Sequence, residues 1–281
     1  MVSCSNEGRW GAADDRGTLN YISAEQVVAA LGLVKAGDVV SIAYDIPFVS
    51  EEASALEVRR EGNSLLDRFT LAVHGFDVTH LDAVGHVFCG ERAYNGRKAA
   101  DSYDEHGLSF GSIAAMTGGI VTRGVLLDVA RVRGVESLTA GEGISVEDVE
   151  QAERAAGVTV GEGDAVFIRS GIGRNLYWLR SEGAADRPGI LAEVVPWLHA
   201  RRVAVYSGDC IEQLPAGGVA SHMPLHEIGL AAMGLALLDN PDVETLRAAC
   251  DRHGRQEFLL VVSPLRIRGG TGSAVNPLAL F

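Results

Sequence analysis

The chain has 281 residues, of which 47% are hydrophobic and 22% charged, and a formal net charge of −13 at pH 7. This acidic excess argues against a nucleic-acid partner, because phosphate binding needs clustered Lys and Arg, and neither a membrane span nor a signal peptide is expected from the apolar stretches. Four widely spaced cysteines without a CxxC motif favour reduced thiols and a cytoplasmic location.

Helices and strands are expected to alternate along the first half of the chain. Residues 23–34 begin with Ser and carry apolar residues at helical spacing, which predicts a capped amphipathic helix. Residues 145–157 begin with Ser, carry acidic residues in the first turn and end with Gly, which predicts a second one. Apolar and β-branched runs predict strands over 38–46, 69–78 and 118–130, the strand over 69–78 leading into a histidine cluster.

The second half shows the same alternation. Strands are predicted over 164–171, 203–209 and 257–267, and helices over 187–202, 224–234 and 241–250. Pro196 is expected to kink or break the first of these helices. The GGTGS stretch at 269–273 precedes no helix, so it is interpreted as a tight structural turn. Because no linker-like tract divides these elements, a single mixed α/β domain over residues 1–281 is expected.

The histidine cluster is HGFDVTHLDAVGH, residues 74–86, which holds three of the eight histidines in the chain. If residues 74–82 are extended, the side chains of His74, His80 and Asp82 project from one face. Two imidazoles and a carboxylate are suitable ligands for a divalent ion, and His86 could turn back to accept a proton from a metal-bound water. A single histidine here would more simply be a turn or surface residue, whereas the spacing H-x-D-x₃-H favours a site.

Asp209 ends the strand predicted over 203–209. Functional groups often lie at that position in α/β sheets, but an aspartate there can equally cap the following turn. The sequence leaves these two roles open.

The segment THLDAVGH resembles the signature H-x-G-T-H-x-D-x-P-x-H of the bacterial cyclase and kynurenine formamidase-like family, which includes isatin hydrolase-like enzymes. The similarity extends over nearly the whole chain, through residues 9–23, 163–171, 224–246 and 269–280. The resemblance implies a swivelling mixed β/α domain, usually dimeric. Members hydrolyse N-formylkynurenine, isatin or related amides with zinc or manganese, and others are assigned to polyketide ring closure.

The resemblance also implies roles for individual residues. His80 and Asp82 match two metal ligands of the family, His86 matches its catalytic base, and His226 matches its second catalytic histidine. Asp239 stands at the position of the distal metal-binding acid, where the family has Glu.

One ligand position departs from the family pattern. Phe76 stands at the first ligand position and cannot bind a metal. His74 lies two residues earlier, on the same face if this segment is a strand, and could supply the missing nitrogen. The predicted metal ligands are therefore His80, Asp82, His74 and Asp239.

Three classes of function follow. The first is a hydrolase of an amide (C–N), lactam or ester bond in a small, aromatic molecule, with zinc or manganese as cofactor and a metal-bound water as nucleophile. The second is a cyclase, dehydratase or isomerase of a secondary-metabolite pathway that uses the same histidines, with or without a metal. The third, a catalytically silent binding protein, has no need of this histidine set. The resemblance further implies a homodimer or higher homo-oligomer, with residues 1–22 reaching across to a neighbour or covering the pocket.

Overall fold

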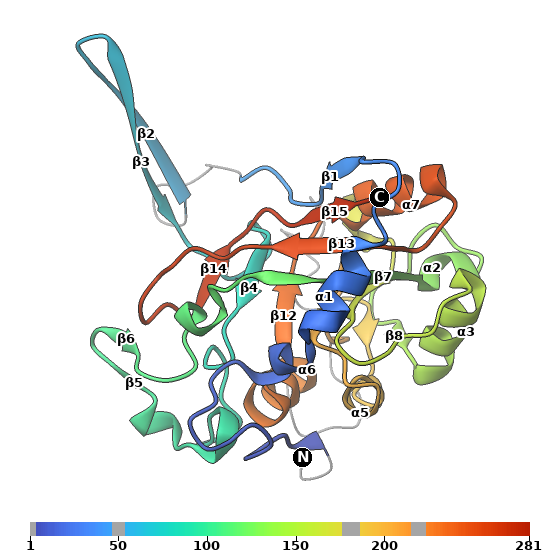
Figure 1. The fold of residues 1–281 in the computed structure, drawn as a ribbon, viewed down its shortest axis with the longest axis horizontal. Coiled ribbons are helices and arrows are strands. Elements are labelled where there is room, and N and C mark those ends of the chain that lie inside the picture. Colours follow the sequence, from blue (N-terminus) through green and yellow to red (C-terminus); the bar gives the residue numbers. More distant parts are fainter. Residues whose placement is uncertain (1–3, 47–53, 176–185, 215–222) are drawn as a thin grey trace.

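A nine-stranded mixed sheet forms the centre of the protein in this computed structural model, which describes residues 4–46, 54–175, 186–214 and 223–281 (Figure 1). Its strand order is β1-β15-β13-β7-β9-β11-β12-β4-β14. These strands are β1 (Val39–Ser41), β4 (His80–Asp82), β7 (Ile120–Asp128), β9 (Ala165–Arg169), β11 (Val205–Gly208), β12 (Ala236–Asp239), β13 (Glu257–Val262), β14 (Gly272–Ala274) and β15 (Leu278–Leu280). The four central strands β7, β9, β11 and β12 are parallel, and the others pair antiparallel to their neighbours.

Smaller elements surround this sheet. Two-stranded pairs are formed by β2 (Ser54–Glu61) with β3 (Ser64–Leu71), β5 (Tyr103–Asp104) with β6 (Gly107–Leu108), and β8 (Gly143–Ile144) with β10 (Gly189–Ile190). The described helices are α1 (Ala24–Leu31), α2 (Val129–Val132), α3 (Val146–Ala156), α5 (Val194–Ala200), α6 (Pro224–Ile228) and α7 (Val243–His253). None of them is long and apolar enough to cross a bilayer.

Apolar residues pack on both faces of the sheet. Along β9, Phe167 belongs to one buried cluster and its neighbours Val166 and Ile168 belong to the other. The first cluster also takes residues from α7, and the second takes residues from α3, α5 and α6. A strand buried on both faces is a continuous apolar run, which is why the central strands could be recognised in the sequence. The expectation of a single mixed α/β domain is confirmed.

Two capped helices are confirmed in detail. Ser23 and Ser145 each accept a hydrogen bond from the backbone N–H three residues later and complete a capping box, at the starts of α1 and α3. Gly157 ends α3 in the left-handed conformation at φ 67°. These ends depend on local chemistry alone, so the sequence was enough to locate them.

The strand predicted over 69–78 is correct only as far as Leu71. Strand β3 ends at Leu71 and belongs to a ribbon with β2, while residues 72–79 form bends that lead to β4. The charged pattern of residues 57–68 suits a ribbon exposed on both faces rather than a sheet strand. His74 therefore reaches the site from a loop, and not from the shared strand face that the alternation predicted.

The helix predicted over 187–202 is shorter than expected. The strand β10 occupies Gly189–Ile190, and α5 begins only at Val194. Pro196 lies in the first turn of α5, where backbone N–H groups have no acceptor within the helix. The proline therefore removes no helical hydrogen bond and neither kinks nor breaks the helix. The helix predicted over 224–234 is α6, which continues as one π-helical turn to Met233 and ends at Gly234 in the left-handed conformation.

The N-terminal segment packs on the body of its own chain. Gly17 has φ +64°, and a Cβ there would lie 2.0 Å from the carbonyl oxygen of Gly234. The side chain of Thr18 donates a hydrogen bond to the carbonyl of Ala204 at 2.7 Å, and Leu19 is buried. This backbone-to-backbone approach, which only glycine permits, holds the segment beside the loop that leads into β12.

Candidate active site

Strand β4 is the structural base of the site. It lies between β12 and β14, and the register places His80 opposite Asp239 and Asp82 opposite Gly272. His80 and Asp82 are two residues apart, so their side chains project from the same face of the strand. Leu81 projects from the other face into the first apolar cluster and is fully buried. The strand thus anchors the two predicted ligands rigidly.

The imidazole of His80 is held in one orientation. Its Nδ1 lies 2.8 Å from the carbonyl oxygen of Val78, which can only accept, so Nδ1 carries the proton. The other nitrogen, Nε2, then has a free lone pair and lies 3.5 Å from Oδ1 of Asp82. A histidine whose second nitrogen donates to a carbonyl is typical of a metal ligand.

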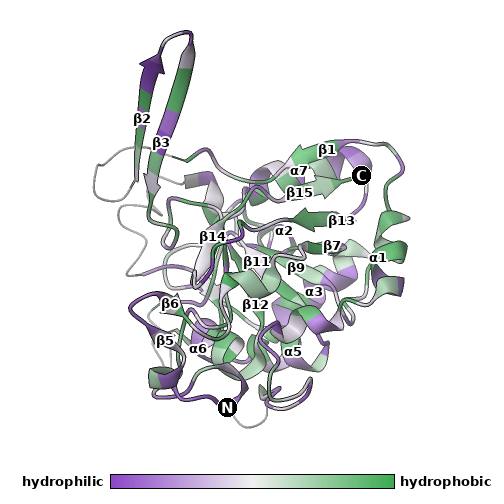
Figure 2. Cartoon of the chain, turned by 60° about the vertical axis from the view of Figure 1, so that its left-hand side comes forward, coloured by the Kyte–Doolittle hydropathy of each residue, from purple (hydrophilic) through white to green (hydrophobic). Residues whose placement is uncertain are grey.

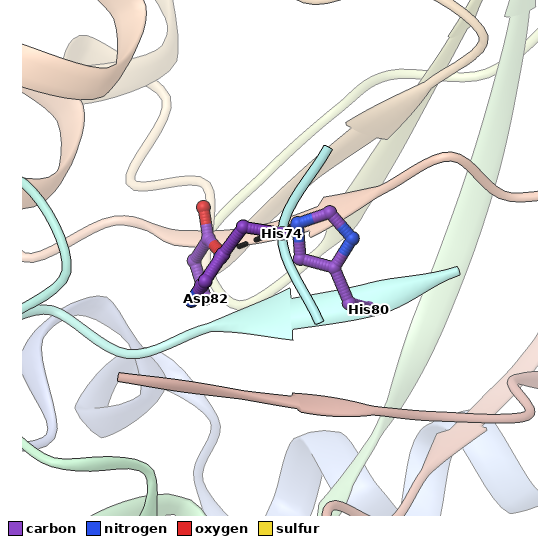
Figure 3. A group of neighbouring side chains, drawn as sticks. All are labelled: His74, His80 and Asp82. Carbon is purple, nitrogen blue, oxygen red and sulfur yellow. Dashed lines mark ion pairs between the residues drawn. The ribbon is translucent and has the colours of Figure 1, made fainter. Parts of the chain in front are cut away.

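His74 approaches the same carboxylate from the loop before β4. Figure 3 shows the side chains of His74, His80 and Asp82 pointing toward one another, and Nδ1 of His74 lies 3.0 Å from Oδ1 of Asp82. Its Nε2 lies 2.9 Å from the hydroxyl of Thr271. If Nε2–H donates to that hydroxyl, Nδ1 has a free lone pair directed at the site.

Gly272 on β14 makes room for the ring of His74. A Cβ at this position would lie 2.7 Å from Cε1 of His74 and 3.0 Å from the carbonyl of Leu81. The GGTGS stretch, predicted to be only a tight structural turn, therefore supplies both the hydroxyl and the space that place His74. Thr271 and Gly272 adjoin the candidate site through His74, and the sequence did not point to them.

We expect Gly272→Ala to displace His74 and to weaken divalent-metal binding by roughly 10- to 100-fold, the range typical of a lost outer-shell support. The measurement is a calorimetric titration of the metal-free protein with Mn²⁺ or Zn²⁺. Gly118→Ala is the matched control, because a Cβ at Gly118 meets nothing within 4 Å. Equal affinities of the two variants would show that Gly272 has no part in positioning His74.

His86 stacks on His74 beyond the end of β4. The two rings are parallel to within 3°, with centroids 3.6 Å apart. Burial lowers the pKa of His86 to about 4, although the charge of Asp82 acts in the opposite direction. His86 is therefore a neutral imidazole at pH 7, next to the proposed ligands.

His226, near the start of α6, lies close to Asp82 and to Asp239. Its Nδ1 lies 3.0 Å from Oε2 of Glu212, and its Nε2 lies 3.4 Å from Asp239 and 3.8 Å from Asp82. Burial lowers the pKa of His226, but its hydrogen bonds with Asp239 and Glu212 outweigh this and hold the pKa well above the ordinary value. Because these carboxylates surround it, His226 carries a proton at neutral pH.

Asp82 is the centre on which these groups converge. Both of its carboxylate oxygens are buried, and neither has a hydrogen-bond partner among the residues that the structure describes. There are two groups of possible ligands, His74–His80–Asp82 and Asp82–His226–Asp239, which share this carboxylate. Within each group the ligand atoms lie within 4.8 Å of one another. A buried carboxylate that makes no hydrogen bond costs several kcal/mol, and imidazole and carboxylate groups directed at one point fit a bound divalent cation.

The six residues predicted for the site all lie together in the structure. His74, His80, Asp82 and His86 come from the loop and strand at 74–86, His226 from α6 and Asp239 from the end of β12. Phe76, at the family's first ligand position, belongs to neither group of possible ligands, and its ring lies 5.0 Å from the guanidinium carbon of Arg187.

Two further residues escaped the sequence reasoning. Glu212 is fully buried and contacts both His226 and Arg187, whose Nη2 lies 3.6 Å from Oε1 of Glu212. Burial lowers the pKa of Arg187, and the charge of Glu212 opposes this. No motif surrounds Glu212, and the one signal was its position shortly after the carboxyl end of β11.

Asp209, whose role the sequence left open, caps a turn. Its carboxylate accepts hydrogen bonds from the backbone N–H groups of Ser170, Gly171 and Gly173 at 2.7–3.3 Å. Cys210, beside it, is a buried thiol whose pKa burial raises. Neither residue belongs to the group around Asp82.

Solved structures of a cyclase and of isatin hydrolases have a fold similar to that of this chain. The crystal structure of a novel cyclase is 28% identical, covers 99% of this chain and 100% of its own, and superposes with a TM-score of 0.89. An isatin hydrolase bound to the product analogue thioisatinate is 18% identical, covers 92% of this chain and 99% of its own, and has a TM-score of 0.62. Isatin hydrolase A from Ralstonia solanacearum, also 18% identical, covers 92% of this chain and 97% of its own, with a TM-score of 0.63.

No curated protein matches the chain in sequence. The sequence profile of the family described as "Putative cyclase" matches residues 40–212, which include the histidine cluster at 74–86 and the buried Glu212. This range covers more than half of the chain, and the structural comparison extends the likeness to its full length. The chain therefore belongs to the cyclase family.

Proposed function

We propose that this protein is a metal-dependent hydrolase of an amide, lactam or ester bond in a small molecule. The observation that carries the proposal is Asp82, a buried carboxylate that makes no hydrogen bond with the described residues and faces three imidazoles. The contact of His80 Nδ1 with the Val78 carbonyl leaves Nε2 as the nitrogen that faces this carboxylate. The contact of His74 Nε2 with Thr271 leaves Nδ1 in the same position. A structural role would instead pair such a carboxylate with donors.

His74, His80 and Asp82 would hold the ion. Asp239 is a further candidate ligand, because its carboxylate belongs to the second group, with Asp82 and His226. Imidazole and carboxylate ligands without a thiolate suit zinc or manganese. When bound, such an ion polarises a carbonyl oxygen and lowers the pKa of a water molecule.

His86 and His226 are a suitable acid–base pair. Burial keeps His86 neutral at pH 7, so it can accept the proton of an attacking water. The carboxylates around His226 keep it protonated, so it can donate a proton to the leaving nitrogen or oxygen. Environments that push two pKa values apart are the usual basis for assigning the acid and the base.

Glu212 positions the acid in this scheme. Its Oε2 accepts the hydrogen bond of the His226 Nδ1–H, which directs Nε2 toward Asp82 and Asp239. Arg187 contacts the other oxygen of Glu212 and compensates part of its buried charge.

A second candidate function is ring closure or dehydration with the same histidines. The supporting observation is the novel cyclase, which is more similar to this chain over its full length than the two isatin hydrolases compared above. In that reaction the acid–base pair would move protons on carbon and oxygen rather than deliver water.

The test uses protein purified without a histidine tag and treated with a chelator. Release of a carboxylic acid is measured for isatin, an N-formyl aromatic amide and an aromatic ester, before and after addition of Mn²⁺ or Zn²⁺. We expect turnover of at least one compound only after metal is restored. Turnover that is unchanged by chelation, or absent from the whole panel with metal bound, would contradict the proposed hydrolase.

A further inference from the structure

The ribbon of β2 and β3, residues 54–71, is an arm that projects from the body of the protein, as Figure 2 shows. Strand β3 ends at the base of this arm, and residues 72–79 lead from there back to β4. This connecting segment carries His74 and contains no helix or strand that fixes its course. Its position beside the site therefore depends on contacts with other parts of the chain.

Asn240, directly after β12, has a backbone conformation that is uncommon for a residue with a side chain. Its φ is 52°, in the left-handed region, where Asn95 and Arg202 are the other described residues besides glycine. Asparagine is one of the few residue types that tolerate this region, and it persists there when the surrounding structure determines it. The contacts of Asn240 show what determines it here.

The side chain of Asn240 binds the connecting segment at two points. Its Nδ2 donates one hydrogen bond to the carbonyl oxygen of Gly75 and another to that of Val78 at 3.3 Å. Carbonyl oxygens only accept, so the amide nitrogen faces them and the amide oxygen does not. Gly75 adjoins His74, so one of the two contacts holds the chain directly beside this proposed ligand.

The second contact falls on the carbonyl that orients His80. The oxygen of Val78 accepts hydrogen bonds both from Nδ2 of Asn240 and from Nδ1 of His80, the latter at 2.8 Å. A carbonyl oxygen has two lone pairs and can serve both donors. Fixing this oxygen keeps the proton of His80 on Nδ1 and leaves Nε2 as the nitrogen that faces Asp82.

The main chain of Asn240 binds the same segment. Its carbonyl oxygen accepts a hydrogen bond from the hydroxyl of Thr79 at 2.6 Å, and Thr79 is buried. The hydroxyl oxygen of Thr79 accepts in turn from the backbone N–H of Tyr44 at 3.1 Å. Asn240 thus fastens residues 75–79 with both its side chain and its main chain, immediately after Asp239.

We infer that Asn240 is a positioning residue, whose amide fixes the Val78 carbonyl and through it the orientation of the His80 imidazole. Its effect on a metal rests on the proposed function, in which His80 is a ligand. Outer-shell partners typically account for 10- to 100-fold in metal affinity. Because Asn240 acts through one further contact, we expect the low end of this range, about 10-fold.

The experiment removes the amide donor and keeps the left-handed backbone. Asn240→Gly deletes the side chain, and Asn240→Asp replaces the donor with a carboxylate that only accepts at neutral pH. The added charge of the aspartate would attract a cation, so weaker binding by both variants cannot be attributed to charge. Asn95→Gly is the matched control, because Asn95 has φ 58° and its amide donates to two carbonyls in the N-terminal segment.

The first readout is the Nδ1 proton of His80, measured by NMR in metal-free protein with isotope-labelled histidine. A hydrogen-bonded proton exchanges slowly with water and gives a signal, which its absence from His80→Ala assigns. We expect the signal in wild type and in Asn95→Gly, and its loss in both Asn240 variants. The second readout is calorimetric titration with Mn²⁺ or Zn²⁺, in which both Asn240 variants should bind about 10-fold more weakly.

A retained His80 signal, or wild-type metal affinity, in either folded Asn240 variant would overturn the inference, as would equal losses in Asn95→Gly. Melting curves identify a variant that fails to fold, and the other Asn240 variant then carries the comparison. The NMR readout involves no metal, so it decides the role of Asn240 separately from the proposed function. Absence of metal binding in wild type would contradict only the latter.

Discussion

His80→Ala is expected to abolish divalent-metal binding. The variant removes Nε2, which lies 3.5 Å from Asp82 and whose lone pair is exposed to the site because Nδ1 donates to Val78. Loss of an outer-shell partner typically costs 10- to 100-fold in affinity, so loss of a ligand should cost about 100-fold or more. The measurement is titration of metal-free protein with Mn²⁺ and Zn²⁺, with His106→Ala as control because the side chain of His106 is 85% exposed.

The variant should keep its fold, because Leu81 and the pairing with β12 and β14 anchor the strand. Wild-type affinity in folded His80→Ala would remove His80 from the ligand set. Cys89→Ala should bind metal as wild type does, since no thiolate belongs to the ligand groups of the described residues.

His86→Ala is expected to lower kcat by on the order of 100-fold or more while leaving metal content and melting temperature unchanged. The reason is that His86 lies beside His74 as a neutral base without belonging to either ligand group. Steady-state kinetics on the hydrolysed member of the panel gives the effect, and kcat should change more than KM.

The pH profile and chemical rescue separate a proton-transfer role from a structural one. Burial lowers the pKa of His86, so wild-type activity should persist below pH 6.5 and fall only as His86 becomes protonated. The variant should lose this acid limb and recover activity when imidazole is added. A variant with normal turnover would exclude His86 as the base, and one that unfolds or loses its metal would show a structural role.

The sequence predicted the site more completely than the fold around it. His80 and Asp82 follow from H-x-D spacing on one strand, a local property. His226 and Asp239 lie far away in the chain, and only the family resemblance connected them with β4. Asp239 reaches the site through the pairing of β12 with β4, and His226 reaches it from α6, and no local pattern encodes either approach.

His74 was predicted for a reason that the structure does not support. The alternation of residues 69–78 suggested one continuous strand, but β3 pairs with β2 in the arm and the chain bends before β4. His74 instead depends on Thr271 and Gly272, nearly two hundred residues later. Glu212 was missed for the same reason, because its contact with His226 exists only in the folded chain.

The central claim is that Asp82 and the histidines around it hold a divalent ion. Metal analysis of the full chain, purified without a histidine tag and reconstituted with Mn²⁺ or Zn²⁺, tests this most directly. The arrangement around Asp82 predicts about one equivalent of metal or more per chain, lost in His80→Ala. Less than about a tenth of an equivalent in folded wild-type protein with either ion, far below the occupancy of a specific site, would contradict the claim.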